Sequence, residues 1–167
     1  MAIVADGPRG YDNRGDSLRL TLLRAPLFPD PAADRGGQRV EWSYFVADHD
    51  VIASGLLERE AALIGHPTRV VRGTPEIVSV GVRLDSEGVL ISSVKSADDG
   101  SGDLVIRLWE SRGGRSTGRL SFDRPVRSVV ECDALEESSD VTAITLTGSS
   151  VELTLRPFEI RTLRARR

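Results

Sequence analysis

The chain has 167 residues and a mass of 18.1 kDa, and its 40% of apolar residues suffice for one ordinary domain or two small ones with a buried core. The net charge of −3 at pH 7 argues against a nucleic-acid partner, because phosphate-driven binding requires a clustered excess of Lys and Arg. No run approaches the ~20 apolar residues of a membrane-spanning helix, which argues against a membrane partner. The single cysteine, Cys132, excludes an internal disulfide and a cysteine-based metal site, and we expect it to be a buried thiol.

The chain starts directly in a strand pattern. Residues 1–5, MAIVA, are apolar, and the turn composition DGPRG follows at residues 6–10. A strand at the first residue suggests that the sequence was cut from a longer protein, at a point within one of its β-sheets. We therefore expect this chain to be a fragment, and a parent reading frame that begins at Met1 would contradict this expectation.

Alternation with period two dominates the rest of the sequence, which is typical of half-buried strands. Turn residues at 98–102 and 112–115 lie between apolar runs, where hairpin turns or short loops are expected. The pattern predicts a mainly β, antiparallel fold. The strands are expected at residues 17–22, 39–47, 77–82, 89–94, 104–109, 118–122, 126–131, 143–147, 150–155 and 159–163.

One segment departs from this pattern. Between residues 51 and 64 the apolar residues fall near helical spacing, with charged residues on the opposite face, which predicts one short helix. Gly65-His66-Pro67 ends it, because Pro cannot continue a helix. Residues 65–75 show little periodicity and are interpreted as a linker. Two β units result, an incomplete one up to about residue 66 and a second one from about residue 76 to the end. The second has the strand number (about seven) and spacing of an immunoglobulin-like sandwich.

Catalytic motifs are scarce. The two histidines, His49 and His66, do not show the spacing of a metal site, and the Asp-His-Asp run at 48–50 favours a surface turn over a ligand set, because adjacent residues of an extended chain point in opposite directions. The acidic residues at 98–103 favour a polar hairpin over a calcium loop, because they lack the loop length and the terminal Glu of such a site. The charge run at 136–140 indicates a solvated loop.

The two tryptophans, Trp42 and Trp109, are open to two interpretations. Aromatic faces suit the apolar faces of sugar rings, so the two residues could form a sugar-stacking surface. Each lies inside a strand pattern beside candidate core residues such as Phe45 and Leu108, which favours packing in the core.

Three stretches resemble glycoside hydrolase family 38 α-mannosidases. They occur in the order found in that family and together span nearly the whole chain. The stretches are GYDNRGDSLRLTLLRAP with PDPAADRG at residues 10–36, VKSADD followed by LVIRLWE at residues 94–110, and LRPFEIRTL at residues 155–163.

The resemblance implies the end of a large β-supersandwich domain over residues 1–75, followed by a small immunoglobulin-like sandwich over residues 76–167. Family members are retaining exo-α-mannosidases, in which an N-terminal catalytic domain carries the aspartate nucleophile and zinc or another divalent metal. We therefore expect no catalytic residue, metal ligand or cofactor in this chain, and no activity by itself. The expected partners are the catalytic domain of the same polypeptide and the α-mannoside substrate. A bacterial cytoplasmic location is expected from the resemblance and from the preference for Arg over Lys. Lys95 is the only lysine of the sequence.

Within the resemblance, the loop after the LLR strand approaches the catalytic domain, which makes Arg35 and Arg24 candidates for the rim of the substrate cleft. A guanidinium is permanently charged and donates to sugar hydroxyls or to a carboxylate across a domain contact. In the alternative interpretation these arginines pair with Asp30 or Asp34 and only shape the loop. Two further alternatives remain for the whole chain, an autonomous carbohydrate-binding module and a structural interaction domain.

Overall fold

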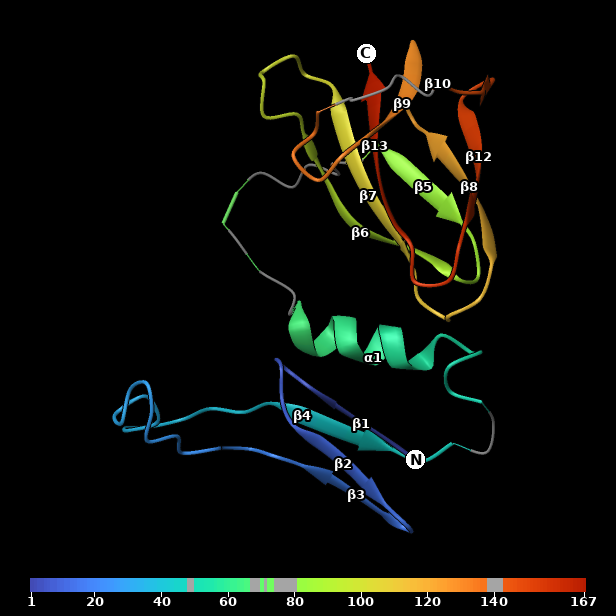
Figure 1. Cartoon of the computed structure of the whole chain (residues 1–167). Helices are drawn as coiled ribbons and strands as arrows, with labels where there is room; N and C mark the ends of the chain where they lie inside the picture. Colours follow the sequence, from blue (N-terminus) through green and yellow to red (C-terminus); the bar gives the residue numbers. More distant parts are fainter. Residues whose placement is uncertain (48–49, 67–69, 71, 74–80, 138–142) are drawn as a thin grey trace. The chain divides into compact units, whose positions relative to one another are not determined.

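The computed structural model describes residues 1–47, 50–66, 70, 72–73, 81–137 and 143–167. They form two compact units, Met1–Arg72 and Gly73–Arg167, whose elements are labelled in Figure 1. Antiparallel strands make up most of both units, and one short helix lies in the first, which confirms the mainly β fold class. None of the helices in these ranges is long and apolar enough to cross a membrane.

The first unit contains two two-stranded sheets. β1 (Ala2–Ala5) pairs with β4 (Trp42–Phe45), and β2 (Tyr11–Arg14) pairs with β3 (Ser17–Leu20) in a hairpin that turns at Gly15, where φ is 61°. β2 was not expected from the sequence, because Tyr-Asp-Asn-Arg shows no apolar alternation. β3 and β4 are shorter than the strands expected at 17–22 and 39–47.

The helix α1 (Leu56–Gly65) starts later than the pattern at 51–64 predicts. The Asp50 carboxylate accepts hydrogen bonds from the backbone N–H groups of Ile52 and Ala53, at 2.9 and 3.1 Å, which holds the preceding residues in turns. At the other end, the N–H of His66 donates to the carbonyl of Ala62 over 2.9 Å. Pro67 lies outside the described residues, so its expected role at the end of the helix stays a prediction.

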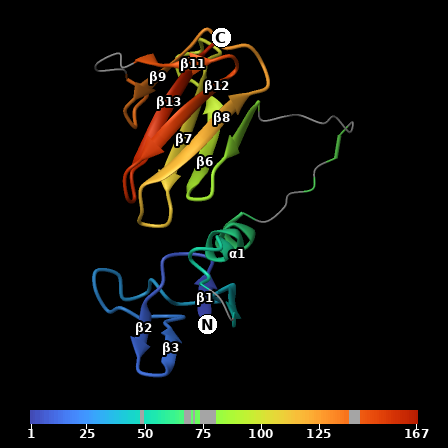
Figure 2. The same cartoon turned by 90° about the vertical axis from the view of Figure 1, so that its right-hand side faces the viewer.

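The second unit is a sandwich of two antiparallel sheets, whose layers are visible in Figure 2. The strand order is β10-β9-β13-β7-β6 in one sheet and β11-β12-β8-β5 in the other. Its further assignment as immunoglobulin-like stays a prediction. The strands are β5 (Val82–Asp85), β6 (Val89–Ser96), β7 (Leu104–Glu110), β8 (Ser116–Phe122), β9 (Ser128–Cys132), β10 (Ala143–Ile144), β11 (Leu146–Thr147), β12 (Ser150–Leu155) and β13 (Ile160–Arg166).

The single strand expected at 143–147 is in fact two. Ala143 pairs with Val130 of β9, whereas Leu146 pairs with Val151 of β12, so the chain crosses from one sheet to the other at Thr145. A period of two describes which face a residue occupies but not which sheet it joins. The split adds one strand, and the described part of the second unit has nine strands where about seven were expected. Of the strand expected at 77–82, residues 77–80 lie outside the described residues.

The two units differ in how much they bury. The second has a continuous apolar core that includes Ile106, Leu120, Val151 and Leu163, all fully buried. In the first unit, the buried hydrophobic residues of the described part are Ala2 and Val4.

Two expectations about single residues have different outcomes. Cys132 is a buried free thiol, as expected, and burial raises its pKa. The core position favoured for Trp42 is wrong, because this side chain is 50% exposed, while Trp109 is half-buried.

Candidate functional site

Residues 21–41 connect β3 to β4 without helix or strand and carry the four site residues expected from the sequence. A loop of this length in a compact unit is uncommon and is often functional. Its tip is a turn organised by Asp30, whose carboxylate accepts the N–H of Ala32 at 2.8 Å. The N–H of Arg35 then donates to the carbonyl of Ala32 at 3.0 Å, and Gly36 follows at a φ of 99°, which glycine adopts without strain.

The side chains of Arg24 and Arg35 are exposed, and neither makes an ion pair or a side-chain hydrogen bond within the described residues. Asp34 is half-buried, and Asp30 serves the turn. The ion pairs with Asp30 or Asp34 that the loop-shaping interpretation requires are therefore not found in this part of the chain. The fold brings the four residues into one loop, but it leaves both guanidinium groups available to an outside acceptor.

The same loop exposes large apolar side chains. Leu27 is 84% exposed and Phe28 is 87% exposed, in the same loop as Arg24, which makes no ion pair with the described residues. Surfaces that contact another molecule typically combine exposed apolar groups with hydrogen-bond donors. This exposure could not be predicted from the sequence, because the apolar residues of a proline-rich stretch show no periodicity.

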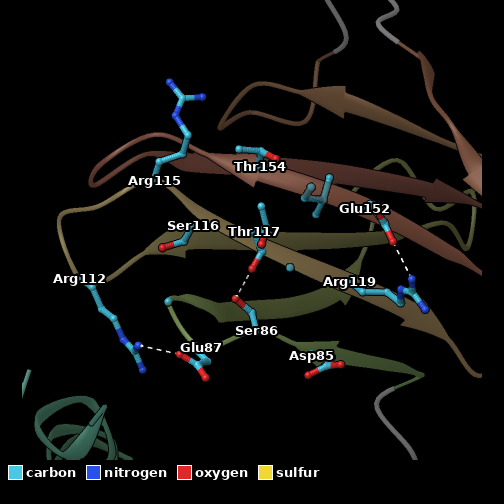
Figure 3. A pocket seen from close by; sticks show the side chains of 13 residues that line it. Asp85, Ser86, Glu87, Arg112, Arg115, Ser116, Thr117, Arg119, Glu152 and Thr154 are labelled. Carbon is cyan, nitrogen blue, oxygen red and sulfur yellow. Dashed lines mark hydrogen bonds and ion pairs between the residues drawn. The ribbon is translucent and has the colours of Figure 1, made fainter. Parts of the chain in front are cut away.

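A second candidate is a cavity of about 750 Å³ on the second unit, lined by residues of β5, β8 and β12 (Figure 3). Its charged side chains are largely paired with one another. Arg119 contacts Glu152 at 2.6 Å and Arg112 contacts Glu87 at 3.5 Å, while Arg115 points away from the other labelled side chains in Figure 3. No aromatic residue lines the cavity, so it offers hydrogen bonds without a stacking surface.

Beside this cavity lies a buried carboxylate that the sequence reasoning missed. Glu110 is fully buried and accepts four hydrogen bonds, from the N–H groups of Arg112 (3.0 Å), Gly113 (2.8 Å) and Phe158 (3.0 Å) and from the hydroxyl of Ser116 (2.9 Å). Burial opposes ionisation, but these hydrogen bonds outweigh it and lower the pKa of Glu110 to about 2. The visible signal was a Glu that closes the apolar strand LVIRLW before a glycine-rich turn.

The acidic stretch at 98–103 is held by two cations of the chain. Lys95 contacts Asp98 at 2.7 Å, and Arg164 contacts Asp99 and Asp103 at 2.5 and 2.8 Å. Hydrogen bonds from Ser101 and from Arg164 hold the pKa of Asp99 well below its usual range. The carboxylates of the discarded calcium interpretation are thus neutralised from within the protein.

Glu136 corrects the expectation of a solvated charge run at 136–140. Its side chain is mostly buried, forms an ion pair with Lys95 and accepts the N–H of Asp98 at 3.1 Å. Glu136 therefore connects its own loop to the loop that contains Asp98. Local charge patterns do not reveal this interaction, because the two residues are 38 positions apart. Residues 138–140 of this run lie outside the described residues, as do Asp48 and His49 of the Asp-His-Asp run.

Comparison with known proteins decides the family. Residues 88–163 match the family model described as the glycosyl hydrolases family 38 C-terminal beta sandwich domain. The second unit is a family 38 C-terminal β-sandwich domain. This match confirms the resemblance to family 38 noted in the sequence. The first unit precedes the matched residues.

Curated α-mannosidases match this chain over almost its whole length. It is 27% identical over 172 residues to α-mannosidase G of Dictyostelium discoideum, 29% identical over 170 residues to human α-mannosidase 2C1, and 25% identical over 193 residues to a Saccharomyces cerevisiae α-mannosidase. Each alignment covers 98% of this chain. The chain spans only 16% of the length of the first two relatives and 17% of the third.

Proposed function

We propose that this chain is the non-catalytic C-terminal β region of a retaining α-mannosidase that hydrolyses terminal α-mannosides, and that it supports the catalytic domain of the same polypeptide. The observation that carries the proposal is that similarity to α-mannosidases extends over both units, across 98% of the chain, and not only over the matched sandwich. In such an enzyme one carboxylate attacks the sugar and another protonates the leaving oxygen.

The metal of such an enzyme would be held outside this chain. Among the residues with described positions, no group of three or more His, Cys, Asp or Glu is arranged to hold a metal ion. The described residues therefore do not fit zinc or another divalent metal, and the expectation of a metal applies to the catalytic domain alone.

The loop at 21–41 is proposed to reach the rim of the active site, where Arg35, with Arg24, donates to substrate hydroxyls or to a carboxylate of the catalytic domain. The support is geometric: both side chains are exposed and unpaired within the described residues, in the loop that also exposes Leu27 and Phe28. A guanidinium keeps its charge at every physiological pH, so it is suited to hold a polar ligand. Asp30 and Asp34 would maintain the shape of the loop.

The test compares this chain with the natural protein that contains it, called the parent protein below. Both are purified and assayed with an aryl α-mannoside. We expect turnover by the parent protein and none by residues 1–167 alone. Turnover by the isolated chain would contradict the non-catalytic role, and a parent protein without α-mannosidase activity would contradict the proposed function as a whole.

A bacterial cytoplasmic location is proposed on the resemblance and on the near absence of Lys, of which Lys95 is the only one. Fractionation of the source cells checks it, with α-mannosidase activity expected in the cytoplasmic fraction. Recovery of the activity from the culture medium would contradict it.

A further inference from the structure

The strands β1 and β4 are apolar on both faces. β1 reads Ala-Ile-Val-Ala, and β4 with the two residues that follow reads Trp-Ser-Tyr-Phe-Val-Ala. In contrast, β12 alternates strictly between buried apolar and exposed polar residues. A near-continuous apolar run is typical of a strand that is buried on both sides, whereas alternation is typical of a strand with one side in water.

One face of the β1–β4 pair is covered in this chain. Ala2 and Val4 are buried on it, and α1 packs against β1 (Figure 1). The cover explains why every second residue of β1 is apolar. It leaves unexplained why the residues in between are apolar as well.

Within the described residues, the opposite face is half-buried along β1 and largely exposed along β4. The strand register places Ile3 beside Tyr44 and Ala5 beside Trp42, and Val46 is the next residue of the same parity. Trp42 is 50% exposed, Tyr44 63% and Val46 74%. The rings of Trp42 and Tyr44 lie side by side, with their centroids 6.4 Å apart and their planes inclined by 33°. We call these five residues the aromatic face.

The composition of the aromatic face favours protein over sugar. No member carries a charge, and the Tyr44 hydroxyl and the Trp42 indole N–H are its only polar side-chain groups. Charged residues begin only past the strand ends, where Asp6 and Glu41 join through a backbone N–H to carboxylate hydrogen bond of 3.0 Å. An apolar centre with aromatic residues and a charged rim is typical of a protein interface, whereas a sugar site requires several hydrogen-bonding groups beside the rings.

We propose that the aromatic face is a docking surface that is covered, in the parent protein, by a further apolar layer of the same α-mannosidase polypeptide from outside residues 1–167. This inference rests on the proposed function. The α-mannosidases that match 98% of this chain extend far beyond it, since it spans only 16% of the first two. The matched sandwich starts at residue 88, so the first unit lies outside it and has only Ala2 and Val4 as buried hydrophobic residues in its described part. A pair of two-stranded sheets with so small a core is marginally stable in water.

The test uses the two tryptophans of the chain as reporters. The variant Trp109→Phe leaves Trp42 as the sole tryptophan, and the matched control Trp42→Phe leaves Trp109. Acrylamide quenching and emission wavelength are measured for both variants in residues 1–167 and in the parent protein from which all other tryptophans have been replaced. We expect Trp42 to be quenched severalfold less in the parent protein, with emission at shorter wavelength. Equal quenching of Trp42 in both proteins would overturn the inference.

Two other occupants give different outcomes. Protection of Trp42 in the isolated chain by mannose or an oligomannoside would make the face a sugar platform, and protection that rises with protein concentration, together with a dimer in sedimentation, would make the occupant a second copy. Either result overturns the inference. α-Mannosidase activity of the same parent samples separates the two proposals. An active parent with exposed Trp42 contradicts only the docking surface, and an inactive parent with protected Trp42 contradicts only the function.

Discussion

Replacing Glu110 by Gln changes one atom in the most densely hydrogen-bonded carboxylate of the second unit. One carboxylate oxygen accepts from the N–H of Arg112 and the hydroxyl of Ser116, and the other accepts from the N–H groups of Gly113 and Phe158. If the oxygen that faces Gly113 and Phe158 becomes the amide nitrogen, two backbone N–H groups lose their acceptor. If the other oxygen does, the N–H of Arg112 loses its acceptor, whereas the Ser116 hydroxyl can turn and accept from the amide. A buried donor without a partner costs about 1–3 kcal/mol, so we expect Glu110→Gln to reduce the free energy of unfolding by about 2 kcal/mol or more.

The pH dependence gives a second readout. The folded-state pKa of Glu110 lies at about 2, below the ordinary value of 4.5. A lowered pKa means that the ionised form stabilises the fold, so this contribution is complete above pH 4.5 and is lost as the pH falls from about 4.5 through about 2. Glutamine does not titrate, and the variant should therefore lose less stability than the wild type across this window.

Urea unfolding of the isolated chain at pH 7 and at pH 3, followed by circular dichroism, measures both effects. The matched control is Glu152→Gln, which removes a surface ion pair with Arg119, and such pairs contribute about 0–1 kcal/mol. If Glu110→Gln lowered stability no more than this control, or if its stability fell as steeply with acid as that of the wild type, the stabilising role assigned to the Glu110 hydrogen bonds would be refuted.

Three further predictions concern the rim, the core and the thiol. Arg35→Ala in the parent protein should lower kcat/KM without changing Tm, whereas Arg39→Ala, a guanidinium of the same loop already paired with Glu41, should have a smaller effect; unchanged kinetics for Arg35→Ala would contradict the rim assignment. Leu120→Ala, at a fully buried position, should cost about 2–5 kcal/mol in urea unfolding, and a loss below about 1 kcal/mol would mean that the two sheets are not packed as described. Cys132 should react with a thiol reagent slowly in the folded chain and rapidly in urea, because it is buried and its pKa is raised; equal rates would show that the thiol is accessible.

Much of the second unit followed from the sequence, because its strands alternate between a core face and a solvent face. The prediction at 150–155 coincides with β12, whose inward residues all enter the core. β13 runs on to Arg166, beyond the predicted end at 163. The charged Arg164 interrupts the apolar pattern there, so the sequence did not predict this part of the strand. The strand includes Arg164 because its guanidinium forms ion pairs with Asp99 and Asp103, which are distant in sequence.

The first unit followed less well, for a different physical reason. Trp42 was expected in a core, and its strand is apolar enough for burial on both sides. Within the described residues, however, only one of the two sides is covered. Sequence patterns show that a residue requires a partner surface without showing which polypeptide provides it.

The candidate site divides in the same way. Resemblance placed Arg24, Arg35, Asp30 and Asp34 in one loop, and the structure places them there. That neither arginine pairs with another described residue could not be predicted, because it depends on where the loop directs each side chain. Glu110 could not be predicted either, since one of its four donors comes from residue 158, 48 positions away.

The crossing of the chain at Thr145 has a consequence for solubility. β10 and β11 are the outermost strands at one side of the two sheets, and each has only two residues. An outer strand has unpaired backbone groups to which a strand of another molecule can bind. A very short outer strand offers few such groups. Because one five-residue segment contributes the outer strand of both sheets on this side, each sheet ends there in a strand too short to pair extensively with a strand of another molecule.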